Sequence, residues 1–388
     1  MNALAVDPGD PDRILAGLDR LGIWRSRDGG SAWASDNQGL RALAVSLIEA
    51  APRAPGTLYA AAQNRGLLKS VDGGATWSSG SFGPSLGGVL ETPRRLVFDG
   101  RAPGLIYGVT SNLWKTGDGG IRWRDLLPVV GDGVVVADDL AMDPRDPRVL
   151  YLVGDQVFCL PDAENCDLDT FRVSKLARSA DGGRHWTVLD FGPLHTPAAP
   201  TSAKGLPVWR SVAVAPDGTV YLAGSALLSS ANGGTSWQSL PNPPGPASGQ
   251  GIKRLFVLPG GPVPGAAPLV FAVVPVATSF DLSGPTRLFV SRDGGHRWLA
   301  GDDAFAPDLP PGTVAVTDLV ASRRPYRLYA GTDHGVFVSR DASGDGPHWA
   351  PLLAGLEDPA VQSLSIDSAT GVVYAATEHA GGLFALRP

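Results

Sequence analysis

Three acidic residues in predicted turns of this chain could take part in acid–base chemistry. Asp19, Asp333 and Glu378 each lie between two short apolar runs. Two carboxyl groups held about 5–5.5 Å or 6.5–9.5 Å apart can hydrolyse a glycosidic bond, one as the acid and the other as nucleophile or base. The sequence fixes no such distance. The three residues are therefore candidates for a catalytic pair, and none is assigned that role.

Other chemistry has less support in the residue pattern. His185, His296 and His348 are widely separated, and no His, Cys or carboxylate cluster has the spacing of a metal site, so we expect no metal and no cofactor. No glycine-rich phosphate loop follows a strand and opens a helix. Cys159 and Cys166 have no His nearby, which argues against a thiol nucleophile. They flank a turn-prone segment, and could form a disulfide or remain two thiols.

A motif that repeats along the chain organises these candidates. The pattern is Ser/Thr-x-Asp-x-Gly-x-x-Trp, and we call each copy a box. Seven of the ten tryptophans close a box, the fifth box has Asn in place of Asp, and the last is three residues longer. The boxes occupy residues 26–33, 70–77, 116–123, 179–186, 230–237, 291–298 and 339–349.

Each box lies between two apolar runs, which is the layout of two strands joined by a turn. Its third residue can accept backbone N–H groups, its glycines can adopt positive φ, and its Trp can pack over the hairpin. The alternative is a calcium loop, but most boxes offer a single carboxylate where such loops use several. We interpret the third residues as turn formers: Asp28, Asp72, Asp118, Asp181, Asn232, Asp293 and Asp341.

Two further apolar runs precede each box, so the repeating unit has four strands. Successive third residues are 44, 46, 63, 51, 61 and 48 positions apart. A four-stranded unit of this length is typical of a propeller blade, and helical periodicity is nearly absent. The longer steps predict loop insertions at 155–176, 191–208 and 259–286. Eight sets of inner strands but seven boxes favour eight blades, with seven as the alternative.

The boxes resemble the Asp-box (bacterial neuraminidase) repeats of β-propellers. Sialidases, xyloglucan-degrading glycoside hydrolases, the sortilin ectodomain and photosystem II assembly factors carry such repeats. The resemblance covers nearly the whole chain. It implies one all-β domain over residues 1–388: a single β-propeller of four-stranded antiparallel blades, with the boxes between the third and fourth strands. It implies no activity, because enzymes and non-enzymes share the repeat.

The catalytic parts of these families are missing from the sequence. A sialidase has an early Arg-Ile-Pro segment, which this chain lacks. The xyloglucan-degrading relatives form their cleft from two propellers, whereas this chain is predicted to hold one. We therefore transfer no catalytic residue from any family.

Composition limits the partners and the location. The net charge of −6 does not support nucleic-acid binding, and no apolar run approaches the ~20 residues of a membrane span. No signal peptide is visible at Met1. The resemblance and a disulfide would favour an extracytoplasmic location, with the cytoplasm as the alternative. A lost upstream segment could supply both a signal peptide and the missing outer strand. We expect a monomer.

In a propeller, the turns between second and third strands lie on the face opposite the boxes. Polar loops there could form a ligand surface, together with insertions near Asp138-Asp139, Trp209 and Asp302-Asp303. We predict a non-catalytic binding or scaffold propeller that presents this face to a protein or glycan. The alternative is a glycoside hydrolase acting through paired carboxylates. The candidate binding residues are Arg20, Gln63, Asn64, Arg65, Asn112, His334 and His379.

Overall fold

The computed structural model describes residues 3–7, 10–18, 22–26, 34–35, 45–52, 54, 57–62, 66–71, 76–79, 85–86, 89–90, 93–126, 128–130, 133–157, 172–190, 208–244, 251–258, 260, 266–276, 284–302, 305, 313–323, 326–340, 347–352, 361–366, 373–377 and 383–386. Within these residues every regular secondary-structure element is a β-strand. The strands form eight sheets, which we number in chain order, and one small hairpin.

The strands of the first four sheets are as follows. Sheet 1 contains β1 (Ala3–Asp7), β2 (Asp10–Leu18), β3 (Gly22–Ser26) and β4 (Ala34–Ser35). Sheet 2 contains β5 (Val45–Ala50), β6 (Leu58–Ala62), β7 (Gly66–Ser70) and β8 (Ser78–Ser79). Sheet 3 contains β11 (Arg95–Phe98), β12 (Ile106–Val109), β13 (Leu113–Thr116) and β14 (Arg124–Asp125). Sheet 4 contains β15 (Val129–Val130), β16 (Gly133–Met142), β17 (Leu150–Val157), β18 (Arg172–Ser179) and β19 (Thr187–Val188).

The remaining strands follow the same plan. Sheet 5 contains β20 (Trp209–Val214), β21 (Val220–Gly224), β22 (Leu227–Ser230) and β23 (Gln238–Leu240). Sheet 6 contains β24 (Arg254–Leu258), β25 (Leu269–Pro275), β26 (Thr286–Ser291) and β27 (Leu299–Ala300). Sheet 7 contains β28 (Val316–Arg323), β29 (Tyr326–Thr332), β30 (Gly335–Ser339) and β31 (Trp349–Pro351). Sheet 8 contains β32 (Val361–Ile366), β33 (Val373–Thr377) and β34 (Leu383–Leu386), and β9 (Ser85–Leu86) pairs with β10 (Val89–Leu90) between sheets 2 and 3.

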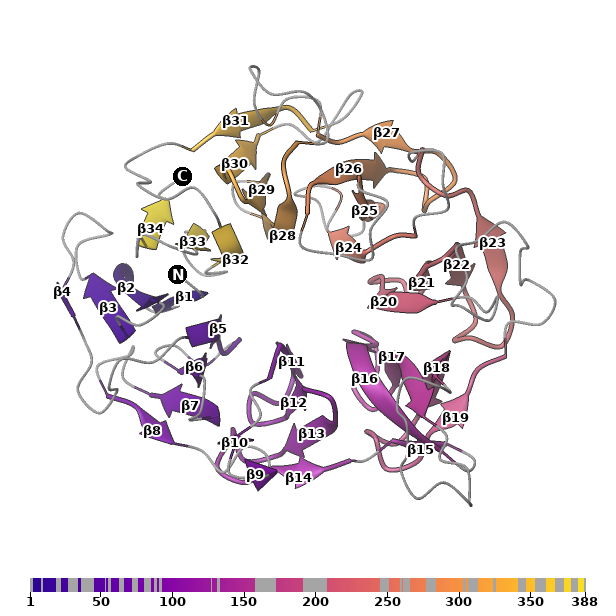
Figure 1. Ribbon diagram of the computed structural model, residues 1–388, viewed down its shortest axis with the longest axis horizontal. Coiled ribbons are helices and arrows are strands. Elements are labelled where there is room, and N and C mark those ends of the chain that lie inside the picture. Colours follow the sequence, from indigo (N-terminus) through magenta and orange to yellow (C-terminus); the bar gives the residue numbers. More distant parts are fainter. Residues whose placement is uncertain are drawn as a thin grey trace.

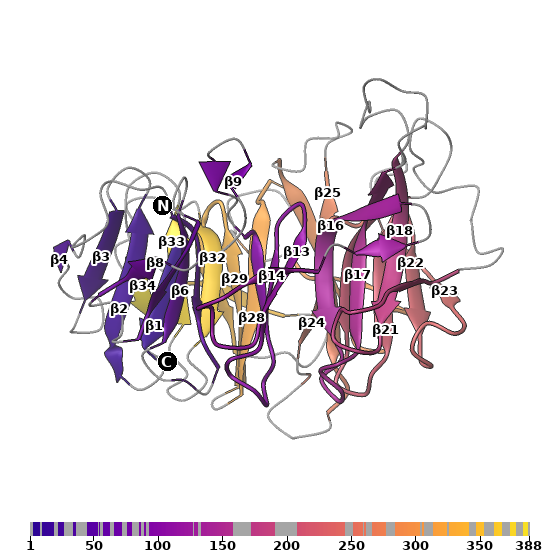
Figure 2. The same cartoon turned by 90° about the horizontal axis from the view of Figure 1, so that it is seen from below.

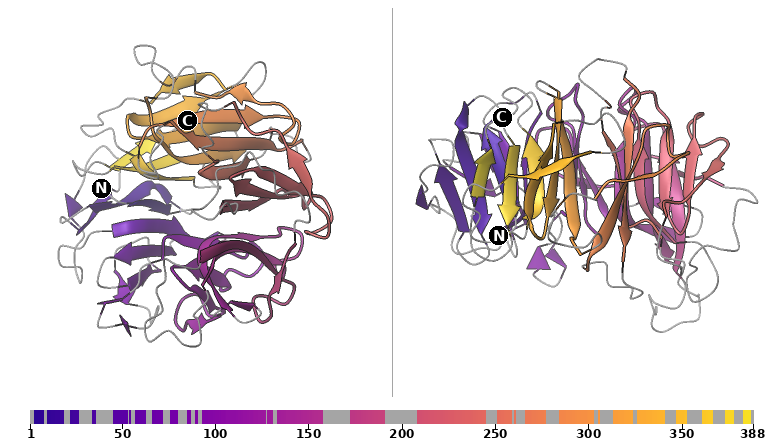
Figure 3. Two further views of the ribbon diagram at one scale, coloured as in Figure 1. Left: turned by 45° about the vertical axis from the view of Figure 1, so that its right-hand side comes forward. Right: turned by 90° about the horizontal axis from the view of Figure 1, so that it is seen from above.

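The sheets stand in a ring (Figure 1). The inner strands line a cavity at its centre, and we call this central region the channel. Consecutive strands pair antiparallel from the channel outward, and six of the sheets have four strands among the residues that the structure describes. Seen from the side, the strands run roughly along the ring axis, so that turns collect on two faces (Figure 2). Sheet 8 lies beside sheet 1, where β32 contacts β1 (Figure 3). The predicted all-β fold of four-stranded antiparallel sheets is confirmed, and the ring fits a β-propeller.

The hydrophobic core lies between neighbouring sheets. Second strands are buried on both faces, as in β12, β21 and β25, which explains their nearly continuous apolar sequence. Between sheets 6 and 7, for example, Phe305 stacks on Trp349 with ring centroids 5.0 Å apart and meets Phe337 edge-on at 5.1 Å. Each sheet therefore covers an apolar face of the next.

Sheet 4 corrects part of the predicted insertion pattern. Residues 155–157 and 172–176 belong to the paired strands β17 and β18, and not to a loop. Asp138 and Asp139 lie within the ten-residue strand β16, whereas the sequence predicted an inserted loop near them. The strand forms here because β-branched residues favour an extended conformation, and three valines, Val134, Val135 and Val136, precede the aspartates. A register shift between Ala137 and Asp139 lets this strand continue past the two aspartates.

The box at 116–123 links β13 to β14 and shows the turn chemistry in full. The Thr116 hydroxyl donates to Asp118 Oδ1 (2.7 Å) and accepts from the Gly120 N–H (3.0 Å). Asp118 Oδ1 also accepts from two backbone N–H groups, those of Ile121 (3.1 Å) and Arg122 (3.0 Å). Gly119 and Gly120 have φ of 70° and 89°. Asp181, Asn232 and Asp293 accept backbone N–H groups in the same way, whereas Asp28, Asp72 and Asp341 lie outside the described residues.

Two of the boxes also hold their sheet to the preceding one through hydrogen bonds. The Tyr59 hydroxyl of sheet 2 donates to the Gly119 carbonyl of sheet 3 (2.8 Å), and Lys69 Nζ reaches the same oxygen (2.5 Å). Tyr107 and Lys115 of sheet 3 hold the Gly182 carbonyl of sheet 4 in the same manner (3.2 and 2.7 Å). The repeated turn is thus also a repeated contact between sheets.

Candidate functional site

The innermost strands bring polar side chains to the channel wall. Five of them, β5, β16, β20, β28 and β32, share a register shift at the same level. Asp139 Oδ2 of sheet 4 accepts from Ser211 Oγ (3.0 Å) and from the Val212 N–H (3.2 Å) of sheet 5. Ser211 Oγ in turn accepts from the Leu255 N–H of sheet 6 (3.2 Å). These side chains therefore join neighbouring sheets through hydrogen bonds, and their role is structural.

Charged groups of both signs meet at this level. Arg95 of sheet 3 forms an ion pair with Asp139. Arg254 donates to the Thr317 carbonyl (3.1 Å) and stacks on Phe256, 4.6 Å from its ring centroid. Burial raises the pKa of the Glu49 carboxyl to about 8; Asp318 adds to the rise, while Arg95 and Arg254 oppose it.

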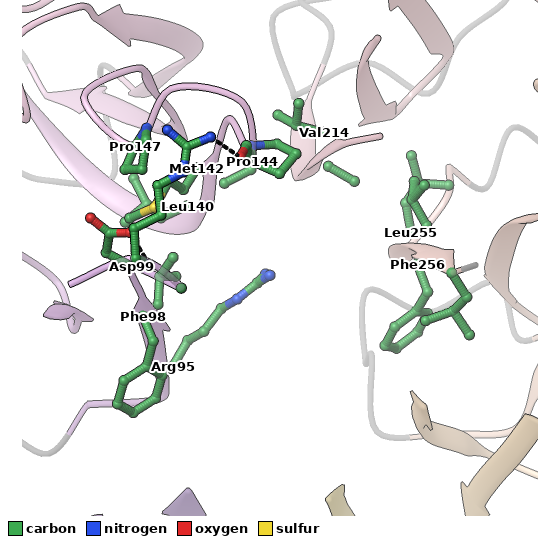
Figure 4. Close-up of a pocket in the computed structure, with 17 residues that line it drawn as sticks. Arg95, Phe98, Asp99, Leu140, Met142, Pro144, Pro147, Val214, Leu255 and Phe256 are labelled. Atoms are coloured by element: carbon green, nitrogen blue, oxygen red, sulfur yellow. Dashed lines mark hydrogen bonds between the residues drawn. The ribbon is translucent and has the colours of Figure 1, made fainter. Parts of the chain in front are cut away.

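One side of the channel is hollowed into a cavity of about 410 Å³, which we call the channel cavity. Its wall comes from the inner strands of sheets 3 to 6 and from the first turns of sheets 3 and 4. Apolar side chains dominate the wall, and many of them are half-buried, including Val97, Phe98, Val214 and Phe256. Figure 4 shows Arg95 pointing from sheet 3 toward the side of the cavity that carries Phe256, and its guanidinium is bound to Asp139. The cavity can accept an apolar group, with this ion pair beside it.

A wider hollow of about 820 Å³ lies on the box face between sheets 3 and 4, and we call it the box-face groove. It is formed by the first turns of both sheets and by the box of sheet 4. Its ionisable lining comprises five basic residues and three acidic ones, apart from Tyr107: Arg101, Lys115, Arg145, Arg148, Arg184, Asp99, Asp146 and Asp181.

The carboxylates of the groove are occupied by neighbours. Asp99 accepts the Arg101 N–H (2.7 Å), and Asp146 pairs with the Arg148 guanidinium (2.8 Å). The hydrogen bonds from Arg148 lower the pKa of Asp146 to about 2, and those from His185 lower the pKa of Asp181. Neither carboxyl can donate a proton near neutral pH, which a general acid must do.

Two of the five groove cations are in ion pairs, since Arg145 is held by the buried Asp143 (2.8 Å) and Arg148 by Asp146. The other three are more available. The Arg101 guanidinium donates to the Arg145 carbonyl (2.8 Å) and is exposed. Arg184 is also exposed, and no side-chain partner of it is found among the described residues. Burial, together with Arg124 and Arg184, lowers the pKa of Lys115. The groove therefore has an excess of basic groups over acidic ones and is suited to an anionic partner.

The residues predicted from the sequence lie elsewhere. Asn112 lies in the turn between β12 and β13, where its N–H donates to Thr110 Oγ1 (3.0 Å). Asp333 accepts the Ala315 N–H (2.7 Å) and contacts His334 Nδ1 (2.8 Å), so it ties a turn to the start of sheet 7. The other predicted site residues fall outside the described residues: Asp19, Arg20, Gln63, Asn64, Arg65, Glu378, His379, Cys159 and Cys166.

Two expectations about the face opposite the boxes need correction. Asp302 was expected to be a free loop carboxylate, but it is buried and held by Arg287 Nε (2.6 Å) and by the Leu288 N–H (3.2 Å). Trp209 is buried in β20 instead of lying on a loop. The groove was missed because three of its five basic residues, Arg101, Arg145 and Arg148, lie in first turns, which the sequence marks only as turns. The richness of these turns in Arg was the available signal.

The residues that the structure describes include no group of three or more His, Cys, Asp or Glu residues that could hold a metal ion. Within the same residues, no helix is long and apolar enough to cross a membrane.

No protein-family model matches the chain, and no curated protein matches it. Similar solved structures include YCF48 bound to a D1 peptide (TM-score 0.50, 14% identity, covering 87% of this chain and 91% of that one). An ancestral GH74 enzyme gives 0.51 at 16% identity, covering 99% of this chain and 54% of its own. PorZ, a surface component of the type-IX secretion system of Porphyromonas gingivalis, gives 0.52 at 14% identity, covering 97% and 55%. The chain thus spans about half the length of the last two, and identities this low show a shared fold alone.

Proposed function

We propose that the chain is a non-catalytic binding propeller whose box-face groove holds an acidic segment of a partner protein. The observation that carries the proposal is the set of three groove cations for which no carboxylate partner is found among the described residues: Arg101, Lys115 and Arg184. The other two basic residues of the groove, Arg145 and Arg148, pair with Asp143 and Asp146. The solved complex of YCF48 with a D1 peptide gives a propeller-like neighbour that holds a protein segment. Binding proteins and GH74 enzymes are both among the neighbours and share the fold, so the fold favours neither, and the groove chemistry is what supports a binding protein.

The test is a binding titration with a fluorescein-labelled peptide of alternating Glu and Gly. We expect saturable binding to the wild-type protein and, for Arg184→Glu, about three- to tenfold weaker binding, as for loss of exposed charge pairs. Arg297→Glu is the matched control, because Arg297 is an exposed arginine in the box of sheet 6 and its replacement changes the net charge equally. Equal weakening by both variants would reject the groove as the site.

Glycoside hydrolysis in the channel is the second candidate function. Glu49 is the observation that favours it, since a pKa of about 8 keeps the carboxyl protonated at neutral pH, as a general acid requires. Asp318, which accepts the Leu319 and Leu364 N–H groups (3.0 and 3.2 Å), would supply the second carboxyl group. A screen of chromogenic glycosides decides the matter: hydrolysis that disappears in both Glu49→Gln and Asp318→Asn would replace the binding proposal.

We further infer the finer organisation of the fold. The eight inner strands support one eight-bladed propeller domain over residues 1–388, and the turn geometry of the described boxes supports their assignment as Asp boxes. We propose a monomer that binds a protein partner, with a glycan as the alternative ligand. Loop residues on the opposite face, including Asn112 and His334, are proposed as a secondary contact surface.

A further inference from the structure

The channel cavity and the box-face groove are two parts of one continuous surface. Asp99, Arg101 and Pro147 line both hollows. These residues belong to the first turns of sheets 3 and 4, so the two turns border both the channel cavity and the groove. Arg101 joins the two turns, because its guanidinium donates to the Arg145 carbonyl (2.8 Å) in the adjacent sheet.

The two parts differ in chemistry. The groove carries the excess of cations described above. The channel cavity is walled by half-buried apolar side chains of the inner strands. In three sheets, one of these apolar residues pairs with an aromatic residue in the middle of the neighbouring second strand. Val97 pairs with Tyr107, Ala213 with Tyr221, and Phe256 with Phe271.

The cavity has the size and the contacts for one large side chain. Its volume of about 410 Å³ is at the lower end of the range for ligand pockets, about 300–1,000 Å³. Aromatic side chains prefer sites that combine apolar walls with a nearby cation, because the ring face attracts the positive charge. Arg101 at the rim meets this need, whereas Arg95 lies beside the cavity in its ion pair with Asp139.

We propose that the partner segment is bipartite: its acidic residues lie in the box-face groove, and one aromatic side chain from the same segment inserts into the channel cavity. This inference rests on the proposed function, and it names the sequence class of the partner. The charge of the groove favours an acidic segment, and because the two hollows adjoin, one segment can reach both of them.

The test compares two peptides that differ at one position. Both carry alternating Glu and Gly; one ends in Trp and the other in Ala. We expect the Trp peptide to bind about ten- to a hundredfold more tightly in isothermal titration calorimetry, as full burial of a large apolar side chain predicts. A third peptide, with Lys in place of Glu and Trp retained, should bind weakly because the groove repels it.

A cavity-filling variant locates the anchor. Ala213 faces the cavity, so Ala213→Trp should remove the advantage of the Trp peptide and leave the affinity for the Ala peptide unchanged. Val320→Trp is the matched control, since Val320 pairs with Tyr329 at the same level of sheet 7 but does not line the cavity. The thermal midpoint of each variant shows whether it is folded.

The outcomes separate the two ideas. If neither acidic peptide binds, the proposed function fails. If both bind with equal affinity, the groove proposal stands and the anchor in the cavity is wrong. If the Trp peptide keeps its advantage with folded Ala213→Trp, the ring binds elsewhere and the inference is likewise overturned.

Discussion

Glu49 shows how one residue can set the pH response of the channel. It pairs with Tyr59, at a level where sheets 3 to 6 carry the apolar residues Val97, Ala141, Ala213 and Phe256. The carboxyl itself lies near Asp318, Arg95 and Arg254, and its pKa is raised from 4.5 to about 8, first by burial and then by Asp318. The folded state thus binds this proton more tightly than the unfolded chain does.

The sign of the pH dependence follows from that shift. The contribution of Glu49 to stability is fully present below pH 4.5 and is lost as the pH rises through about 8. We expect Glu49→Gln to raise the thermal midpoint relative to wild type at pH 8 to 9 and to leave it unchanged at pH 4. Melting curves at a series of pH values check this. A gain of equal size at every pH would mean that the carboxyl is not buried in its charged form.

Asp118 gives the opposite sign. Its pKa is lowered by the hydrogen bonds from the Arg122 N–H and the Thr116 hydroxyl. The contribution of this carboxylate is present at neutral pH and is lost as the pH falls through the folded-state pKa. Asn232 occupies the equivalent position in sheet 5 and accepts the Ser236 N–H (2.9 Å) without a charge.

We therefore expect Asp118→Asn to be tolerated and Asp118→Ala to lower the thermal midpoint more. Asn keeps an oxygen that can accept the two turn N–H groups, whereas Ala leaves them to water. Thermal melts of both variants at pH 7 and pH 4 provide the measurement. If the two variants melt alike at pH 7, the side-chain oxygen does not hold the turn.

At the scale of the elements, two tyrosines of second strands, Tyr59 and Tyr107, link their sheets to the next box. Tyr107 donates to the Gly182 carbonyl (3.2 Å), while the buried Tyr329 hydroxyl of sheet 7 has no hydrogen-bond partner among the residues that the structure describes. Removing the first hydroxyl breaks a bond between sheets, and removing the second relieves a buried unpaired group. The two tyrosines thus form a matched pair for mutation.

Tyr107→Phe should cost about 0.5–1.5 kcal/mol of unfolding free energy, the usual net value of one hydrogen bond. Tyr329→Phe should be neutral or stabilising, because no bond is lost and a buried polar group is removed. Urea denaturation measures both. Equal losses in the two variants would show that packing, and not the bond to Gly182, determines the effect.

The same elements show what the sequence could predict. The turn within a box is local, since Thr116, Asp118 and Gly120 bond to one another, so residue types and spacing predicted the strands around it. Its contact with Tyr59 crosses 60 residues and depends on how two sheets pack, which no local pattern records. The strand extension of sheet 4 was missed for a related reason: Asp138 and Asp139 are typical of turns, and pairing with β17 overrides that preference.

For the whole molecule, the candidate site depends on the closed ring. Arg101, Arg145 and Arg184 come from two sheets and meet only because the first turns and the boxes share a face. The sequence predicted loops on the opposite face, since it could count turns but could not show which of them border a hollow. The groove is lined by more basic than acidic residues, whereas the chain as a whole has a net charge of −6.

This contrast predicts how binding responds to salt. Charges farther apart than the Debye length, about 10 Å at 0.1 M salt, are largely screened, so the acidic remainder of the surface affects the groove only at low ionic strength. Raising the salt from about 50 to about 500 mM should weaken the acidic Glu–Gly peptide severalfold in wild type, because exposed ion pairs are screened within this range. Arg184→Glu should show a shallower dependence and Arg297→Glu the wild-type slope, measured by fluorescence anisotropy. A salt-independent affinity would mean that the exposed cations do not hold the peptide, and the groove would be rejected as its binding site.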